Sequence, residues 1–413
     1  MWMRLNAALL LGIATTSAFG ATPEAVLETY ADIALAGYED ALSGAEALDV
    51  AADALLASPS PVTLDAARAA YKAARPAYQQ TEAFRFGNPV VDDWEGRVNA
   101  WPLDEGLIDY VDASYGTESD ENGLYTANVI AHTSLEIDGK SVDLTQLTPE
   151  VIRGLNEAGG IEANVSTGYH AIEFLLWGQD LHGTGPGAGE RPATDYDLKA
   201  CTHDNCDRRA QYLKSAVDLL VSDLKEMVGD WQQGGKARTD LGGIGVSAIL
   251  TGMGSLSYGE LAGQRMKLGL ILHDPEEEHE CFSDTTDVAY LNDAVGIRNV
   301  YVGAYTRTDG SVVSGPSLSE LVAEKDKALD TEIRGLLDAT LARFDDLHKR
   351  VVAGEAYDQL IGEGNEGGNA VVQAAIDALV AQTRGIERAV SLLGLDVTVE
   401  GSDSLDNPDA VFQ

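Results

Sequence analysis

One stretch decides how this chain is organised: Thr167-Gly168-Tyr169-His170-Ala171-Ile172-Glu173-Phe174-Leu175-Leu176-Trp177-Gly178. Its apolar residues would cover nearly every side of a helix, which predicts a buried helix. His170 and Glu173 lie three residues apart within it, so they project from the same helical face. An imidazole and a carboxylate are costly to bury without partners. A metal ion is a partner that both can share, and this donor pair suits zinc, iron, copper or manganese.

A simpler interpretation stands beside this one. A single histidine on an apolar helix is more often a hydrogen-bonded core residue than a metal ligand. On that interpretation His170 and Glu173 hydrogen-bond each other and Arg85 inside a structural interface.

The first twenty residues have the pattern of a secretory signal. Arg4 supplies the positive charge, residues 7–13 form a short apolar segment, and Ala18-Phe19-Gly20 fits a cleavage site. We expect cleavage after about Gly20 and export to the periplasm or the outer cell surface. No later stretch has the ~18 consecutive apolar residues typical of a transmembrane helix.

The charge balance excludes some classes of partner. Lys and Arg number 28 against 67 Asp and Glu, which gives a net charge of −39. Nucleic acid and anionic membranes are poor partners for such a surface, whereas cations are natural ones. The charge can equally serve only to keep an exported protein in solution.

The chain has three cysteines. Cys201 and Cys206 flank a short acidic loop and can close a local disulfide in an oxidising compartment, which would leave Cys281 over. The sequence does not decide which pair forms. A metal site of Cys201, Cys206 and His203 is a weaker alternative because it lacks a clear fourth ligand.

The remaining patterns predict a largely helical protein. Helix starts at Thr22-Pro23-Glu24 and after Pro61 open the chain. A Gly- and Pro-rich surface loop is expected after Gly178, and a solvated acidic loop over 273–280. We expect an N-terminal helical bundle over 21–200, a C-terminal bundle over 201–399 and a disordered tail over 400–413.

Gly168-x-His170-x-x-Glu173 resembles the Gly-x-His-x-x-Glu motif of the imelysin family. The resemblance extends over nearly the whole chain after the signal, and its iron-regulated, exported branch is the most similar. It is carried by several further blocks, which are Thr81-Glu82-Ala83-Phe84-Arg85-Phe86-Gly87, Asp92-Asp93-Trp94-Glu95-Gly96, Val98-Asn99-Ala100-Trp101-Pro102-Leu103-Asp104-Glu105-Gly106-Leu107-Ile108-Asp109-Tyr110, Ser257-Tyr258-Gly259-Glu260-Leu261-Ala262-Gly263-Gln264-Arg265-Met266 and Cys281-Phe282-Ser283-Asp284.

The resemblance implies an all-α fold of two helical-bundle domains related by pseudo-symmetry, with His170 near the groove between them. It implies a bacterial exported protein tied to iron. The family is named after an insulin-cleaving metallopeptidase, but this chain has no His-Glu-x-x-His motif, which would supply two histidine ligands and a glutamate base.

By the resemblance, four residues would hold a divalent or ferric ion, with iron favoured and zinc an alternative: His170, Glu173, Glu82 and Asp104. The groups that orient these ligands or line the groove would be Arg85, Trp101, Glu105, Tyr258, Glu260 and Arg265.

Three functions follow as hypotheses. The favoured one is a non-enzymatic metal-binding protein for iron uptake or sensing, whose partners are the ion and iron-uptake proteins or a peptide. The second is a metallopeptidase with Glu173 or Glu82 as general base. The third is a partner-binding helical scaffold without a metal.

Overall fold

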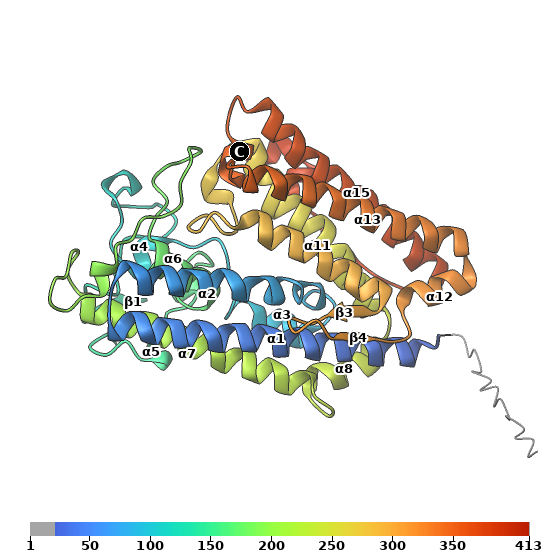
Figure 1. Ribbon diagram of the computed structural model, residues 1–413, viewed down its shortest axis with the longest axis horizontal. Helices are drawn as coiled ribbons and strands as arrows, with labels where there is room; N and C mark the ends of the chain where they lie inside the picture. Colours follow the sequence, from blue (N-terminus) through green and yellow to red (C-terminus); the bar gives the residue numbers. More distant parts are fainter. Residues whose placement is uncertain (1–20, 413) are drawn as a thin grey trace, which may run out of the picture.

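The computed structural model describes residues 21–412, which form two helical bundles that meet along one side (Figure 1). The expectation of an all-α fold is confirmed, because the only strands in this part of the chain form two short antiparallel hairpins. One pairs β1 (Ser134–Ile137) with β2 (Lys140–Asp143), and the other pairs β3 (Ala304–Thr306) with β4 (Val312–Ser314). The expected signal sequence, residues 1–20, lies outside the described residues.

The first bundle is built on long helices that lie side by side: α1 (Pro23–Ala57), α2 (Pro61–Gln79) and α7 (Cys206–Trp231) (Figure 1). The expected helix starts are confirmed, since Thr22 and Ser60 cap α1 and α2 and a proline follows each cap. Shorter elements complete the bundle: η1 (Glu82–Phe84), α3 (Pro89–Glu95), α4 (Glu105–Ile108), η2 (Ala113–Tyr115), α5 (Pro149–Arg153), η3 (Ala158–Gly160), α6 (Gly168–Trp177), η4 (Ala193–Tyr196) and α8 (Lys236–Ile244).

An aromatic cluster shows where the first bundle ends. Trp231 of α7 contacts Tyr30 and Tyr38 of α1 and Phe84 of η1, with ring centroids 5.7–6.5 Å apart. Helix α7 therefore belongs to the first bundle, and the expected boundary at residue 200 is wrong. The boundary lies instead between α8 and the next helix, where the chain turns by 103°. The Gly- and Pro-rich loop does not separate two domains, because its Arg191 is buried against the end of α6.

The second bundle contains the long helices α11 (Thr286–Val302), α13 (Lys327–Val352) and α15 (Glu366–Leu393). A π-helical segment, η5 (Leu256–Lys267), packs against α15 between α9 (Ser247–Ser255) and α10 (Leu268–Leu272). The smaller elements are η6 (Pro275–Glu277), α12 (Leu318–Lys325) and α14 (Tyr357–Ile361).

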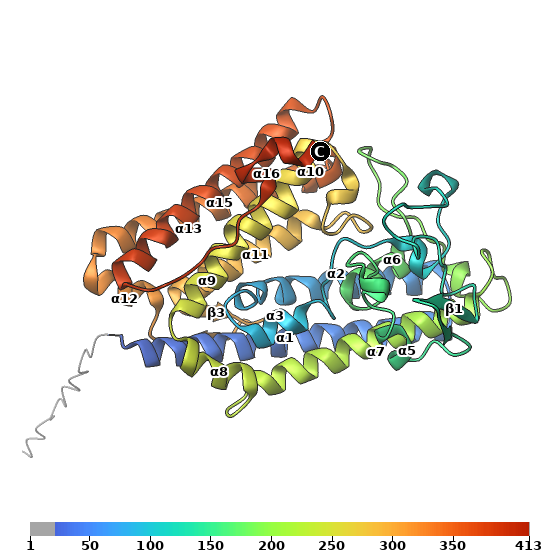
Figure 2. The ribbon, with the colours of Figure 1, turned by 180° about the vertical axis from the view of Figure 1, so that it is seen from behind.

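The end of the chain is ordered, so the expected disordered tail is wrong for residues 400–412. It runs back along the second bundle (Figure 2) and forms α16 (Asp403–Asp406) and η7 (Pro408–Phe412). Glycines of η5 explain the close approach, because a Cβ added to Gly263 would lie 2.3 Å from Ser402 Cβ. Ser404 Oγ also donates to the carbonyl of Gly263 at 2.9 Å.

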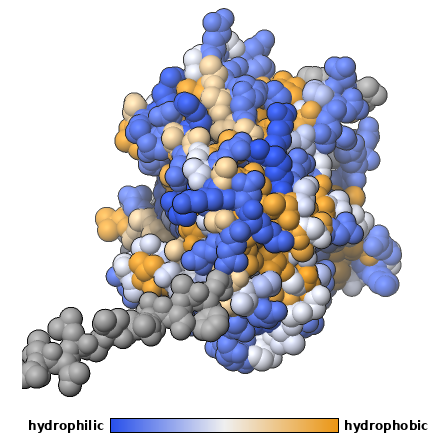
Figure 3. Space-filling view, turned by 90° about the vertical axis from the view of Figure 1, so that its right-hand side faces the viewer, coloured by the Kyte–Doolittle hydropathy of each residue, from blue (hydrophilic) through white to orange (hydrophobic). Residues whose placement is uncertain are grey.

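No single helix within residues 21–412 is long and apolar enough to cross a membrane. Helix α8 and the helical segment Ser247–Leu272, which are bent by 103° relative to each other, reach the required length and apolar composition only when they are counted together. The face drawn in Figure 3 is mostly hydrophilic, with apolar residues in scattered patches.

Candidate metal-binding site

Helix α6 begins where only glycine fits. Gly168 has a φ of +82°, and a Cβ there would lie 2.4 Å from the carbonyl oxygen of Val98. The same carbonyl accepts a hydrogen bond from Tyr169 N at 2.7 Å. This contact holds the first turn of α6 against the 98–104 loop and directs His170 toward the junction of the two bundles. Every residue of α6 is buried, as its composition predicts.

His170 and Glu173 contact each other, as their spacing predicts. The Nδ1 atom of His170 lies 3.2 Å from Glu173 Oε2. Tyr71 donates to the same oxygen at 3.2 Å, and the backbone N–H of Ser283 donates to Oε1 at 2.9 Å. Both carboxylate oxygens therefore already have partners. Burial raises the pKa of Glu173 to about 7, although the hydrogen bond from Ser283 offsets part of the shift.

A second imidazole lies beside the first. The ring of His279 meets that of His170 edge to face, at an interplanar angle of 70° and with 4.6 Å between the ring centroids. Both side chains are 1% exposed. Within residues 21–412, neither Nε2 of His170 nor Nδ1 of His279 has a hydrogen-bond partner. We call these two residues the imidazole pair.

Burial keeps the imidazole pair neutral. Burial, together with the positive charge of Arg75, lowers the pKa of His170 to about 3. Burial and the charge of Arg265 lower the pKa of His279 well below its ordinary range. A neutral imidazole has a free lone pair on one nitrogen, and this is the form that binds metal ions.

The position of His279 corrects an expectation. We expected residues 273–280 to form a solvated loop, but Glu278, His279 and Glu280 are all buried. Glu280 forms an ion pair with Arg75 in which neither side chain is more than 2% exposed. Arg75 also donates to Asn99 Oδ1 at 2.8 Å. One feature of the sequence could have indicated this burial: the acidic segment directly precedes the Cys281-Phe282-Ser283-Asp284 block, which carries part of the family resemblance.

A cleft of about 630 Å³ opens beside the imidazole pair and includes His170 in its lining. Trp101 also lines it, and its ring lies 5.9 Å from that of His279. The other residues of interest along the cleft are acidic: Asp104, Glu105, Asp112, Asp180, Glu276 and Glu277. The structure therefore brings Asp104, Glu105 and Trp101 into the same cleft as His170.

Three carboxylates of the cleft, those of Glu105, Glu276 and Asp104, are protonated more readily than usual. Burial and the negative charge of Glu276 raise the pKa of Glu105 to about 8. Burial and the charge of Asp274 raise the pKa of Glu276 to about 7. Burial also raises the pKa of Asp104, and a hydrogen bond from Asn122 at 2.5 Å offsets part of this. A cation in the cleft would relieve the repulsion that causes part of these shifts.

Glu82, the remaining expected ligand, lies in a different cluster. Its Oε2 accepts a hydrogen bond from Arg265 at 2.8 Å, and Arg265 also pairs with Glu260 at 2.8 Å and Asp293 at 3.1 Å. The negative charge of Glu82 lies near enough to His170 to offset a small part of the lowering of the His170 pKa.

Arg85 and Tyr258, which were expected at the groove, do not line the cleft beside His170. Arg85 pairs with Asp92 at 3.1 Å and Glu95 at 3.5 Å. Tyr258 donates to Asp406 at 2.6 Å, against the C-terminal segment.

The residues present fit a metal ion in their chemistry, because two neutral imidazoles each have a buried nitrogen without a hydrogen bond, and one of the two, His170, lines the acidic cleft. As the side chains lie, however, no three His, Cys, Asp or Glu groups in the described part of the chain are placed to hold an ion. A third ligand would have to rotate inward.

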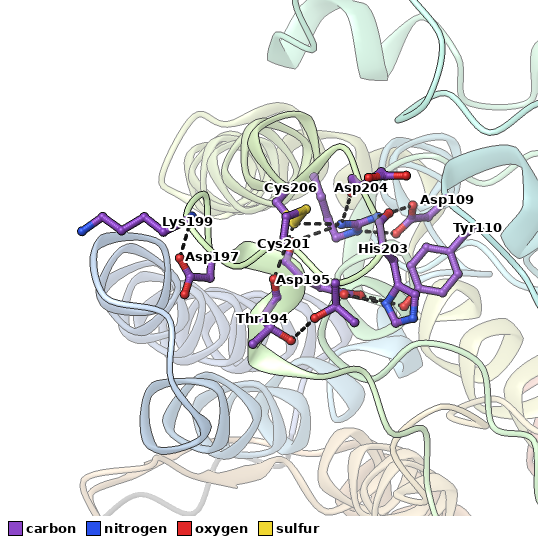
Figure 4. The surroundings of a disulfide bond; sticks show 12 residues. Asp109, Tyr110, Thr194, Asp195, Asp197, Lys199, Cys201, His203, Asp204 and Cys206 are labelled. Carbon is purple, nitrogen blue, oxygen red and sulfur yellow. Dashed lines mark hydrogen bonds and ion pairs between the residues drawn. A yellow bond between two sulfur atoms is a disulfide. The ribbon is translucent and has the colours of Figure 1, made fainter.

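The disulfide between Cys201 and Cys206 is confirmed, and Cys281 is a free thiol. The alternative of a metal site at Cys201, Cys206 and His203 is wrong, because both sulfurs are bonded to each other. Figure 4 shows His203 turned instead toward Asp195, with Nδ1 and Oδ1 2.7 Å apart.

The disulfide lies beside a buried network of Arg191 and Arg209 with Asp109 and Asp195. Arg209 donates to Asp109 at 2.6 Å, and Arg191 reaches Asp109 at 2.7 Å and Asp195 at 3.0 Å.

Solved structures and a named relative are similar to this chain. A protein from Parabacteroides distasonis described as an iron-regulated protein A precursor has a TM-score of 0.63 and 20% identity, over 91% of this chain and 97% of that one. An imelysin-like protein from Psychrobacter arcticum has a TM-score of 0.58 and 16% identity, over 92% and 99%. These likenesses concern the fold.

Iron-regulated protein A from Synechococcus elongatus is 33% identical over 76 residues, which are 18% of this chain. The match thus spans only about a fifth of that relative's length, 21%. The family model of imelysin matches residues 34–386, most of the chain. The chain belongs to the imelysin family.

Proposed function

We propose that this protein is an exported metal-binding protein that serves iron uptake or iron sensing, and that it holds its ion at the imidazole pair. The observation that carries the proposal is the juxtaposition of His170 and His279, buried, neutral and 4.6 Å apart beside an acidic cleft. The names of the similar proteins, which refer to iron regulation, support the choice of iron.

Glu173 has a different role from the one that its spacing suggests. A metal-bound histidine usually makes a hydrogen bond through its other ring nitrogen, often to a carboxylate, and this fixes the orientation of the ring. The contact between Nδ1 of His170 and Glu173 has this arrangement and leaves Nε2 for the ion. We infer that Glu173 orients His170, while Asp104 or Glu105 supplies oxygen from the cleft. Two imidazoles and a carboxylate are a donor set that suits ferrous iron, with zinc or manganese as competitors.

Isothermal titration calorimetry tests the proposal. Ferrous, ferric, zinc and manganese ions are titrated separately into the wild type and into His170→Ala, His279→Ala and Glu173→Gln. We expect both alanine variants to lose the binding heat for the favoured ion. Glu173→Gln should weaken binding by about 10- to 100-fold, as the loss of an orienting group does.

His132 offers a matched control because its side chain is exposed and contacts only the carbonyl of Asn128 in the described structure. His132→Ala should bind as the wild type does. Equal heats from His170→Ala and His132→Ala would reject the proposed site.

The metallopeptidase hypothesis finds less support in the geometry. A general base needs an oxygen free to take a proton from water. Both oxygens of Glu173 accept hydrogen bonds, and Glu82 is paired with Arg265. Incubation of the purified protein with unfolded peptides, with and without a chelator, decides the matter: chelator-sensitive cleavage that His170→Ala abolishes would favour the peptidase.

A further inference from the structure

A second cavity, of about 400 Å³, lies beside the end of α6. Its lining shares Asp112, Gln179 and Leu181 with the cleft next to His170, but the proposed function does not use it. The apolar part of its lining consists of Tyr110, Val111, Trp177, Leu181 and Pro192. A hollow of this size, with apolar walls and a few polar groups, is typical of a site for a small molecule.

Arg191 also lines this cavity, and part of its guanidinium group has no partner. The side chain is 0% exposed, and its Nη1 atom forms ion pairs with Asp109 at 2.7 Å and Asp195 at 3.0 Å. Within residues 21–412, its Nε and Nη2 atoms have no hydrogen-bond partner. Buried polar groups are normally hydrogen-bonded, so two unpaired donors on one buried side chain point to a ligand.

The unpaired donors of Arg191 lie at the wall of the cavity. A Cβ added to Gly178 would lie 3.8 Å from Nε, and the guanidinium carbon lies 5.0 Å from the ring centroid of Tyr110. Gly178 and Tyr110 both line the cavity. The contact with Tyr110, and one with the ring of Phe174 at 5.3 Å, hold the guanidinium in place but supply no acceptor for Nε or Nη2.

The disulfide loop supplies another wall of the cavity. His203, which lies in the loop that Cys201 and Cys206 close, lines the cavity, and its ring lies against that of Tyr110 with centroids 4.5 Å apart (Figure 4). Its Nδ1 atom contacts Asp195, so Nε2 remains for a ligand at the mouth of the cavity. The disulfide therefore fixes a residue of the cavity as well as a loop.

The charges around Arg191 suit one added negative group. The buried network of two arginines and two aspartates described above is neutral by itself. Arg68 adds a positive charge next to it, because its Nη2 donates to the carbonyl of Arg191 at 3.0 Å and its Nε to that of Leu176 at 3.1 Å. Two exposed carboxylates, Asp112 and Glu190, also line the cavity and would repel an ion with two negative charges.

We propose that this cavity binds a small molecule with one carboxylate group and an apolar body. The Nε and Nη2 groups of Arg191 hold the carboxylate through two parallel hydrogen bonds, since a guanidinium presents its N–H groups as a rigid fork that matches the two oxygens. The apolar body lies between Trp177 and Tyr110. The proposal does not rest on the function proposed above.

Isothermal titration calorimetry tests the proposal on protein that is purified with a chelator and then dialysed free of it, so that no metal ion takes part. The probes are 3-phenylpropanoate, 2-phenylethylamine and inorganic phosphate. We expect binding of 3-phenylpropanoate. We expect none of 2-phenylethylamine, which has the same apolar body with an ammonium group in place of the carboxylate, and none of phosphate.

Three variants locate the binding. Arg191→Lys keeps a positive charge beside the aspartates but lacks the fork, so affinity should fall at least about tenfold. Val111→Trp fills the cavity from a half-buried position outside the buried network and should abolish the binding heat. Val50→Trp makes the same change at a position of α1 that is 70% exposed, and it should bind as the wild type does.

The comparison of Val111→Trp with Val50→Trp decides the matter even if Arg191→Lys does not fold. Equal binding by these two variants would place the ligand elsewhere and overturn the proposal. An absence of heat from 3-phenylpropanoate in the wild type would show that water alone satisfies Nε and Nη2. Binding of 2-phenylethylamine or phosphate as tight as that of 3-phenylpropanoate would reject a monocarboxylate as the ligand.

Discussion

The ion pair between Arg75 and Glu280 should be among the most sensitive points of the structure. The two side chains are 2% and 0% exposed. Glu280→Gln keeps a hydrogen-bond acceptor but removes the negative charge. Among the described residues, the groups left in contact with Arg75 would be neutral, including Asn99 at 2.8 Å and the ring of Tyr169 at 4.5 Å. Leaving a buried charge without its partner costs about 3–5 kcal/mol, so we expect a loss near 3 kcal/mol in the free energy of unfolding.

A double-mutant cycle measured by urea unfolding checks the reasoning. Arg75→Met alone should also destabilise strongly, because Glu280 would keep, within residues 21–412, only the hydroxyl of Thr285 as a side-chain partner, at 2.7 Å. The double variant should recover most of the loss, since no buried charge remains unpaired.

The exposed pair Arg388 and Glu332 is a matched control, with the same chemistry, N–O distances of 2.6–3.0 Å and side chains about half exposed. Glu332→Gln should cost far less than Glu280→Gln, because ion pairs at the surface contribute little to stability. If Glu280→Gln costs no more than this control, or if the double variant is as unstable as either single variant, the argument from burial is refuted.

Three further outcomes are expected. Gly168→Ala should lower the free energy of unfolding by more than about 2 kcal/mol, because a side chain at this positive φ is strained and its Cβ would collide with the carbonyl of Val98. A variant as stable as the wild type in chemical denaturation would contradict the role given to Gly168. Glu105 has its pKa raised from 4.5 to about 8, so the folded state keeps a proton that the unfolded state releases, and stability falls as the pH rises through this window. Relative to Glu105→Gln, the wild type should lose about 3 kcal/mol between pH 4 and pH 7, and parallel pH curves would oppose this. Replacing Cys201 and Cys206 by serine should lower the unfolding free energy by about 2 kcal/mol, as expected for so short a loop, and an unchanged urea midpoint would argue against it.

Features with a local cause were predictable from the sequence. The contact between His170 and Glu173 follows from their spacing on one helix, and the starts of α1 and α2 follow from caps and prolines. The disulfide was one of the options that cysteine spacing allowed. The order of the C-terminal segment was missed; its close approach to η5 depends on glycines such as Gly263, whose lack of a side chain leaves room for Ser402.

Features that depend on docking between bundles were not predictable in this way. The acidic segment before Cys281 has a solvated composition, yet His279 and Glu280 are buried because Arg75 of the first bundle supplies a counter-charge. Glu82 is an equally plausible ligand by residue type, but Arg265, far away in the sequence, pairs with it. Linear spacing does not show which carboxylate an arginine will neutralise.

Under the proposed function, the same pairing separates acidic residues that would bind the ion from acidic residues that stabilise the fold. Glu280 and Glu82 face arginines that balance their charges within the protein. Glu105 and Glu276 line the cleft beside His170. Burial and a neighbouring carboxylate raise the pKa of each: the neighbour is Glu276 for Glu105 and Asp274 for Glu276. A cation that enters the cleft meets carboxylates whose repulsion it relieves, and then two neutral imidazoles that need lose no proton to bind it. A hydrolase would in addition need a free base at this point, whereas the carboxylate nearest to His170, that of Glu173, is fully engaged by Tyr71 and Ser283. The distribution of charge therefore favours holding an ion over activating water.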